Sequence, residues 1–294
     1  MNILLTGGTG FIGNTLSRKL IEAGHDLRIL TRDKDVEPPF YHWNKESIDE
    51  KVFDDLDGII HLAGAPLMKN WTKSYKKEII DSRVNSANFL FNKVKEYQLD
   101  LKFFISASGS SYYGQQTSNK IFSENDDAGN DFLAEVCVAW ENAAFQFEEI
   151  GAKVVCIRTP LVLAKHSDSF QLMKKPTQFG FGACLGKGSQ WMTWVHLDDL
   201  CEIYAQAINN PKVIGAVNAI ATEQTSHQNF MQQLAFNLKS KIYLPNIPEG
   251  LVKLGMGEKS TLILDGSRIS NQKLLDAGFK FEYETLNKVF KEIL

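Results

Sequence analysis

The chain shows a repeated pattern in which a short apolar run is followed by a longer segment with apolar residues three or four positions apart. The runs predict strands of a parallel sheet that are buried on both faces, and the longer segments predict amphipathic helices. Strands are predicted at residues 3–5, 27–31, 58–64, 101–106, 153–157 and 215–220. Helices are predicted at about residues 11–21, 71–97 and 131–150, with a fourth ending near Asn209. This alternation is typical of a doubly wound α/β fold.

The alternation becomes less regular after Arg158. Residues 179–188 are rich in glycine and aromatic side chains, and a closing helix is expected near residue 294. We therefore expect a Rossmann-like domain over residues 1–240, with substrate-side insertions at about 160–195, and a small C-terminal domain over residues 241–294.

A glycine-rich turn follows the first predicted strand directly. Its three glycines are spaced G-x-G-x-x-G between a strand and a helix, which is the context that a dinucleotide-binding fingerprint requires. The glycines allow a tight turn, a close approach of a pyrophosphate and close packing of the helix, whose N-terminus offers N–H groups to phosphates. The predicted cofactor contacts in this turn are Gly7, Gly8, Thr9, Gly10, Phe11, Ile12 and Gly13.

The residues after the second strand bear on which dinucleotide binds. An acidic residue there favours NAD by binding the ribose 2′-OH, whereas an arginine accommodates the 2′-phosphate of NADP. Arg32 comes first and Lys34 follows, so we predict NADP, while Asp33 leaves NAD as the alternative. Asp33 is equally compatible with a solvated loop position.

Small and polar residues at the ends of later strands extend the predicted cofactor site. Residues 62–64 would let the backbone lie against a flat adenine and its ribose. His61, in the same apolar run, is interpreted as a core histidine. The cofactor contacts predicted in this part of the chain are Leu62, Ala63, Gly64, Ser106 and Arg158.

Composition excludes several classes of function. The net charge of −3 provides no basic field for nucleic acid or for an anionic membrane. No apolar run is long enough for a membrane span, and no basic leader stands at the start, so we expect a cytoplasmic protein with no membrane partner. The four cysteines form no C-x-x-C pair, which predicts no metal site and four buried thiols: Cys137, Cys156, Cys184 and Cys201.

Several short motifs together resemble the extended short-chain dehydrogenase/reductase superfamily, which includes the NAD-dependent epimerases and dehydratases. They are Thr6-Gly7-x-x-Gly10-x-x-Gly13, His61-Leu-Ala-Gly64, Ser106-Ala-Ser108, Tyr113-Gly114 and Val195-His-Leu-Asp198. Other segments resemble its atypical, epimerase-like branch, which carries a C-terminal domain of unknown function and is named for nucleoside-diphosphate-sugar epimerases. They are Phe132-Leu-Ala-Glu135, Trp140-Glu141, Gln190-Trp191, Trp194-Val-His196 and Ala277-Gly-Phe279.

The resemblance implies chemistry by a tyrosine, a lysine four residues later that lowers its pKa, and a serine that holds the substrate oxygen. Ser108 matches the serine, but Val136 and Trp140 stand at the tyrosine and lysine positions, and Arg83 replaces the superfamily's asparagine. A single Tyr-x-x-x-Lys occurs, from Tyr41 to Lys45, in a polar loop where we interpret it as chance.

Other side chains would therefore have to carry the chemistry. Glu135, Cys137 and Glu141 lie on the same predicted helix, and structural roles are favoured for Cys137 and Glu141. We take three residues as candidate catalytic groups: Ser108, Tyr113 and Glu135. Arg83, which can bind an anionic group bidentately, and Tyr112 are candidate substrate contacts.

These features lead to a primary hypothesis and two alternatives. The primary one is an NADP-dependent enzyme that acts on a small polar substrate such as a nucleotide sugar, by hydride transfer or epimerisation. The first alternative is a non-catalytic NADP-binding module that senses the cofactor or docks a partner, and the second is a structural α/β protein. Superfamily members often dimerise through helices, so a homodimer is also compatible.

Overall fold

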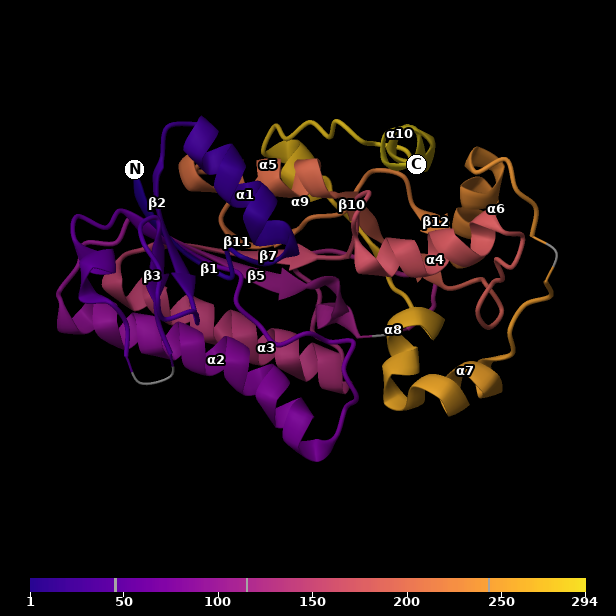
Figure 1. The fold of residues 1–294 in the computed structure, drawn as a ribbon, viewed down its shortest axis with the longest axis horizontal. Helices are drawn as coiled ribbons and strands as arrows, with labels where there is room; N and C mark the ends of the chain where they lie inside the picture. The colour runs from indigo at the N-terminus through magenta and orange to yellow at the C-terminus, as the bar shows by residue number, and fades with distance from the viewer. Residues whose placement is uncertain (45–46, 115, 243) are drawn as a thin grey trace. The chain divides into compact units, whose positions relative to one another are not determined.

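The computed structural model describes residues 1–44, 47–114, 116–242 and 244–294 (Figure 1). The chain forms two compact units, each built from separate segments. Unit 1 comprises residues 1–109, 135–158 and 201–217, and unit 2 comprises residues 110–134, 159–200 and 218–294. The boundary expected between residues 240 and 241 is a different division and stays a prediction. No helix among the described residues is long and apolar enough to span a membrane.

Unit 1 is built on the main sheet, which has seven strands in the described part of the chain. Their order is β11-β7-β5-β4-β1-β2-β3. The strands are β1 (Asn2–Thr6), β2 (Asp26–Thr31), β3 (Phe40–His42), β4 (Gly58–His61), β5 (Phe103–Gly109), β7 (Lys153–Thr159) and β11 (Gly215–Asn218). Strand β1 pairs in parallel with both β2 and β4. The predicted Rossmann-like α/β sheet is confirmed.

Helices cover both faces of this sheet (Figure 1). Helix α1 (Phe11–Glu22) and α5 (Leu197–Asn209) lie on one face, joined by an ion pair of 2.6 Å between Lys19 and Glu202. Helix α2 (Lys73–Glu96) and α3 (Phe132–Phe145) lie on the other. The helix predicted over 131–150 is α3 continued by the 3-10 turn η3 (Gln146–Ile150). A second 3-10 turn, η1 (Glu50–Phe53), precedes β4.

An aromatic cluster fixes the α2 and α3 side of the sheet. The ring of Phe147 stacks on Phe104 of β5 at 3.7 Å between centroids and meets Phe91 of α2 edge-on at 5.2 Å. Leu4 and Ile59, on the central strands, are fully buried in the same cluster. Burial of this many apolar side chains, each contributing roughly 1.5–3 kcal/mol, makes the sheet a rigid base for the loops at its edge.

Unit 2 contains short strands and helices. The strands pair as β8 with β10, β9 with β12, and β6 with β13. They are β6 (Ile121–Phe122), β8 (Leu161–Leu163), β9 (Trp191–Met192), β10 (Trp194–His196), β12 (Thr225–Ser226) and β13 (Arg268–Ile269). The helical elements are η2 (Ser110–Tyr113), α4 (Asp168–Gln178), α6 (His227–Asn237), α7 (Glu249–Met256), η4 (Gly257–Ser260), α8 (Thr261–Leu264), α9 (Gln272–Asp276) and α10 (Leu286–Ile293).

The core of unit 2 lies between α4, α6 and α10. Phe170, Phe230 and Phe290 are fully buried there, and the ring of Phe230 meets Phe290 edge-on at 5.4 Å. The apolar stripe of α10 recurs at helical spacing, which explains why this helix packs with one face inward.

A buried carboxylate attaches the C-terminal segment of unit 2. Asp199 accepts hydrogen bonds from the backbone N–H groups of Glu282 (2.8 Å) and Tyr283 (2.9 Å). The ring of Tyr283 lies 3.8 Å from that of His196. Burial raises the pKa of Asp199, and the two N–H groups oppose this change. The Trp194-to-Asp199 motif therefore holds the last part of the chain in place.

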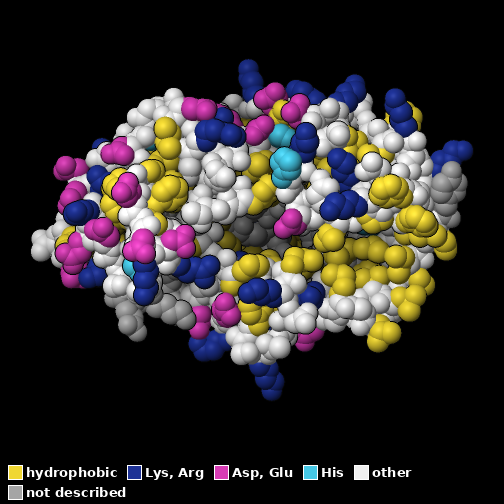
Figure 2. All heavy atoms as spheres, in the orientation of Figure 1, with side chains coloured by type: hydrophobic (Ala, Val, Ile, Leu, Met, Phe, Trp, Pro, Cys, Tyr) yellow, Lys and Arg dark blue, Asp and Glu magenta, His cyan; other side chains and the backbone are white. Residues whose placement is uncertain are grey.

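Large apolar side chains are also exposed on unit 2. Figure 2 shows them gathered on the right of the view. The most exposed are Leu172, Phe179, Phe181, Phe236, Leu251 and Leu254. Two of these, Phe179 and Phe181, belong to the irregular glycine-rich segment that the sequence predicts.

Candidate cofactor and substrate site

The glycine-rich turn lies where the strand order of the sheet reverses. Thr6, the last residue of β1, pairs with Leu30 of β2 on one side and with His61 of β4 on the other. Ligands of open α/β sheets bind at such a switch point, outside the carboxyl ends of the strands.

Two glycines of the turn are required by close packing. A Cβ atom on Gly13 would lie 2.2 Å from the carbonyl oxygen of Gly7, and one on Gly8 would lie 2.6 Å from Ile29 Cγ2. Gly7 itself has a φ of +70°, a conformation that favours glycine. The start of α1 therefore lies directly against the end of β1.

Gly10 has a different role, because it is exposed and caps α1. A Cβ atom there would come within 4 Å only of the Gly7 carbonyl oxygen, at 3.2 Å. The first turn of α1 contains no acidic side chain. The N–H groups at the start of this helix can therefore receive the phosphates of a dinucleotide.

Thr6 brings the two predicted cofactor segments together. Its buried hydroxyl oxygen accepts hydrogen bonds from the backbone N–H groups of Leu62 and Ala63, each at 3.1 Å. A Cβ atom on Gly7 would lie 2.9 Å from the carbonyl carbon of Leu62. Sequence reasoning assigned Thr6 no role of its own, although its position at the end of β1 is the signal that could have identified it.

The end of β2 presents Arg32 and keeps Asp33 close to the strand. Arg32 is exposed. The Asp33 carboxylate accepts a hydrogen bond from the Thr31 hydroxyl (3.2 Å), and the Asp33 N–H donates to the same hydroxyl (3.3 Å). The backbone carbonyl of Asp33 lies 3.0 Å from His42 Nδ1. Asp33 therefore has structural partners within its own loop.

His61 is a core histidine, as the sequence predicts. It is fully buried, and its Nδ1 accepts a hydrogen bond from the Trp140 indole (3.3 Å). Its Nε2 lies 2.8 Å from the Ser86 hydroxyl, so these partners assign the ring proton to Nε2. Burial lowers the pKa of His61 to about 3, and the positive charge of Arg83 acts in the same direction.

Acidification is expected to destabilise unit 1 through His61. The unfolded state takes up the proton near the ordinary pKa of 6.5, whereas the folded state resists it down to about 3. Stability is therefore full above pH 6.5 and decreases as the pH falls, by about 3 kcal/mol at pH 4.5. Urea unfolding between pH 7 and 4.5 measures this slope.

His61→Gln should flatten that slope. It should leave the parts due to His227, whose pKa burial lowers to about 4, and to His25 and His196, whose pKa values burial also lowers. The exposed His166 provides the matched control, His166→Gln, which should keep the wild-type slope. An unchanged slope in His61→Gln would show that His61 is not the source of the loss of stability at low pH.

The Arg83 side chain packs against residues 64 and 65, at the end of the predicted cofactor segment 62–64. Its guanidinium donates to the carbonyls of Ile79 (2.9 Å) and Ala65 (3.2 Å) and lies 4.8 Å from the centre of the Trp140 ring. Only 7% of its surface is exposed, and a Cβ atom on Gly64 would lie 2.8 Å from its Cζ. Backbone carbonyls and an indole ring contact the guanidinium in this conformation, and the predicted bidentate contact between Arg83 and an anionic substrate stays a prediction.

A buried triad joins Ser108, Glu141 and Arg158. The Ser108 hydroxyl donates to Glu141 Oε1 (2.7 Å), and Arg158 donates from Nε to Oε1 and from a terminal nitrogen to Oε2, each at 2.8 Å. All three residues are buried: 4% of the surface of Ser108, 4% of Glu141 and 2% of Arg158 is exposed. These contacts are those expected of the structural role favoured for Glu141, which stays a prediction. The Arg158 side chain is buried and paired with Glu141, and its predicted cofactor contact stays a prediction.

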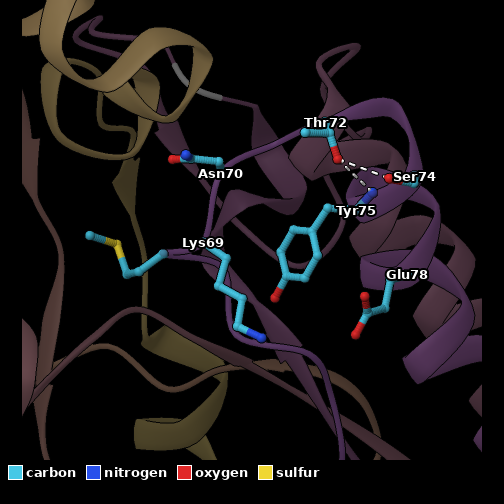
Figure 3. A pocket seen from close by; sticks show the side chains of 7 residues that line it. Lys69, Asn70, Thr72, Ser74, Tyr75 and Glu78 are labelled. Carbon is cyan, nitrogen blue, oxygen red and sulfur yellow. Dashed lines mark hydrogen bonds between the residues drawn. The ribbon is translucent and has the colours of Figure 1, made fainter.

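Unit 1 also contains an open hollow beside the start of α2 (Figure 3). It has a volume of about 560 Å³. It is lined by Met68, Lys69, Asn70, Thr72, Ser74, Tyr75 and Glu78. These residues follow β4 and the predicted cofactor segment 62–64 in the chain. Sequence reasoning assigned none of them to a site.

Comparisons with known proteins agree with a dinucleotide-binding fold. The sequence profile of the NAD dependent epimerase/dehydratase family matches residues 3–220, and that of a domain of unknown function, DUF1731, matches residues 247–293. Epimerase family proteins of Staphylococcus haemolyticus and Staphylococcus saprophyticus are each 32% identical over 295 residues, which cover 99% of this chain and 98% of each relative. The chain belongs to the NAD-dependent epimerase/dehydratase family.

Solved structures show the same fold. Human epimerase family protein SDR39U1, determined with NADPH, has a TM-score of 0.88 at 23% identity and covers 100% of this chain and 99% of its own. A nucleoside-diphosphate sugar epimerase of Corynebacterium glutamicum has a TM-score of 0.82 at 28% identity, over 99% of this chain and 57% of its own. The resemblance and the fold predicted from the motifs are confirmed, and this epimerase/dehydratase family member has the NAD(P)-binding fold.

Two other candidate side chains of this family member face inward. Burial and the nearby Glu141 raise the pKa of the Cys137 thiol to about 12, so it stays neutral at pH 7 and the structural role favoured for it is confirmed. All four cysteines are free and buried, as predicted. Ser106 is fully buried and donates to the carbonyl of Ala107 (2.9 Å), and its predicted cofactor contact stays a prediction.

The remaining catalytic candidates lie in different units. Tyr113, in unit 2, is fully buried and donates a hydroxyl hydrogen bond to Asn218 Oδ1 (2.7 Å), and its predicted catalytic role stays a prediction. Its neighbour Tyr112 is half-buried, and Glu135 of unit 1 is exposed; both stay predictions. Lys45, from the chance Tyr-x-x-x-Lys match, lies outside the described residues.

Proposed function

We propose that this protein is an NADP-dependent oxidoreductase or epimerase that acts on a nucleotide sugar. The observation that carries the proposal is the intact dinucleotide cradle, in which Thr6 holds residues 62–64 beside the glycine turn at the switch point. The homologues named as epimerase family proteins and the nucleotide-sugar epimerases among the structural neighbours support the substrate class.

The residues of the cradle fit an NADP molecule. The backbone of Gly7 to Gly13 and the start of α1 would hold the pyrophosphate, and residues 62–64 would lie against the adenosine half. Arg32 would bind the 2′-phosphate, since Asp33 is held by Thr31. When bound, the cofactor supplies the exchange of a hydride with the substrate carbon.

Loss of the Arg32 guanidinium is expected to remove the preference for NADP. Arg32→Ala should raise the Kd for NADPH by about tenfold to thirtyfold, because a charge-assisted contact with phosphate is lost, and should leave the Kd for NADH unchanged. Calorimetric titration with both nucleotides measures this. Arg18→Ala, an exposed arginine of α1, is the matched control. An equal increase of the Kd values for NADPH and NADH would contradict the proposal that Arg32 binds the 2′-phosphate.

Ser108 is the proposed substrate contact. Its proton is donated to Glu141, so its oxygen offers lone pairs to a ligand and accepts a hydrogen bond from a substrate hydroxyl. Arg158 keeps the Glu141 carboxylate in place and thereby fixes this orientation. The pair thus orients an alcohol that is to be oxidised.

The function is tested by following cofactor absorbance and sugar interconversion with a panel of nucleotide sugars and small carbonyl compounds. Turnover that decreases about a hundredfold in Ser108→Ala, with NADPH binding intact, supports the proposal. Absence of turnover with every member of the panel contradicts it.

A non-catalytic, NADP-binding module is the second candidate. It is favoured by Val136 and Trp140, which are 4% and 8% exposed at the positions of the superfamily's tyrosine and lysine. A partner protein that binds stoichiometrically and only in the presence of NADPH, together with absence of turnover, would support this second candidate.

A further inference from the structure

The hollow beside α2 is formed by a segment that its own hydrogen bonds hold in place. The Tyr75 hydroxyl donates to the Pro66 carbonyl (2.6 Å), and the Trp71 indole donates to the Leu67 carbonyl (2.8 Å). The neighbouring Ala65 N–H donates to the Ser82 hydroxyl (2.9 Å). Because α2 holds the segment at residues 65 and 66, and the other end of the segment continues directly into α2, the shape of the hollow exists before a ligand binds, which reduces the cost of binding.

The position and size of the hollow suit a small polar ligand. Met68, Lys69 and Asn70 lie on the segment that leaves the carboxyl end of β4, the edge of a parallel sheet at which ligands bind. Ser74, Tyr75 and Glu78 lie at the start of α2, which this segment joins. A volume of about 560 Å³ is within the range of small-molecule sites.

Two opposite charges line the hollow without forming an ion pair with each other. The Lys69 ammonium lies 5.6 Å from the centre of the Tyr75 ring. Figure 3 shows this ammonium and the Glu78 carboxylate on either side of the Tyr75 hydroxyl. Among the described residues, neither charge has an ion-pair partner, so both can bind a ligand.

We propose that this hollow binds a neutral, hydroxyl-rich ring, with Lys69 and Glu78 holding neighbouring hydroxyl groups. A sugar hydroxyl both accepts and donates, so one can accept from the ammonium while the next donates to the carboxylate. A phosphate or carboxylate would be attracted by Lys69 but repelled by Glu78. Met68 and Tyr75 add apolar surface for the C–H groups of the ring.

This inference rests on the proposed function, since a nucleotide sugar would supply such a ring. UDP-glucose is the probe, and its affinity relative to UDP, measured by calorimetry, reports the contribution of the sugar. Lys69→Met and Glu78→Gln should each raise the Kd for UDP-glucose about fivefold, because each removes one charged hydrogen bond at an exposed site. Binding of UDP and of NADPH should not change. Lys73→Met and Asp81→Asn, on α2 but outside the lining, should bind like the wild type.

The signs of the two effects distinguish the ligand classes. If Lys69→Met weakens the probe and Glu78→Gln strengthens it, the site prefers an anion and the neutral-ring proposal is wrong. Equal affinity of the wild type for UDP and UDP-glucose, or no effect of either variant, overturns the site itself. Absence of NADPH binding by the wild type is a separate result, which removes the proposed function while the UDP-glucose titrations still decide the role of the hollow.

Discussion

Replacement of Gly10 by valine is expected to raise the Kd for NADPH at least about a hundredfold, roughly 3 kcal/mol, with little change in Tm. Gly10 has φ −80° and ψ 177°, an extended conformation that valine adopts, and its Cβ would approach only the Gly7 carbonyl oxygen at 3.2 Å. A valine therefore fits once the Gly7 carbonyl shifts by a few tenths of an ångström, a much smaller change than Gly13 would require. The valine methyl groups would nevertheless cover the N–H groups of α1 that receive the pyrophosphate. Calorimetry and thermal unfolding measure the two quantities.

Gly13 provides the contrast within the same turn. A Cβ atom there would lie 2.2 Å from Gly7 O and 2.6 Å from Gly8 Cα, so Gly13→Ala must displace the backbone. It should lose both NADPH binding and several degrees of Tm. Asn14→Ala, on the exposed side of α1, should affect neither. NADPH binding by Gly10→Val at the wild-type Kd would show that the turn is not the pyrophosphate site.

Breaking the buried ion pair of unit 1 should be the most damaging change to stability. Glu141→Gln leaves the Arg158 guanidinium, 2% exposed, without its carboxylate, and this should lower the free energy of unfolding by about 3–5 kcal/mol. Ser108→Ala removes one hydrogen bond and should lower the free energy of unfolding by about 1 kcal/mol. Urea unfolding followed by tryptophan fluorescence measures both.

A double variant separates the charge effect from packing. Glu141→Met combined with Arg158→Met removes both charges, so it should be more stable than Glu141→Gln although it lacks the whole ion pair. If Glu141→Gln does not fold, the double variant still tests the charge effect, because it has no unpaired buried charge and is expected to fold. A loss below 1 kcal/mol in Glu141→Gln would show that the carboxylate is not essential to the unit.

The parts of the fold that sequence predicted are those with local causes. The unit of β1, turn and α1 follows from an apolar run, three glycines and a helical stripe that are contiguous in the chain. In unit 2, helices α4 and α6 were not predicted, and strands of two or three residues such as β9 and β12 are too short for their periodicity to be recognised.

The sequence indicated which residues belong to the candidate site, but not which of them contact one another. Ser108, Glu141 and Arg158 were each singled out, yet their contacts join positions 33 and 17 residues apart, which no local pattern reveals. Arg83 was expected to contact a substrate because it occupies the position of the superfamily's asparagine and its guanidinium can bind an anionic group bidentately. The Trp140 ring and two carbonyls bury it instead, and only the folded chain brings them together.

The four buried thiols make the protein its own reporter of local opening. Cys156 lies on β7 in the sheet of unit 1, and Cys184 lies in the core of unit 2. An alkylating reagent can modify each thiol only when the surrounding structure opens, so its labelling rate measures the equilibrium of that opening. Mass spectrometry of the two peptides would thus rank the units by resistance to unfolding, without any engineered probe.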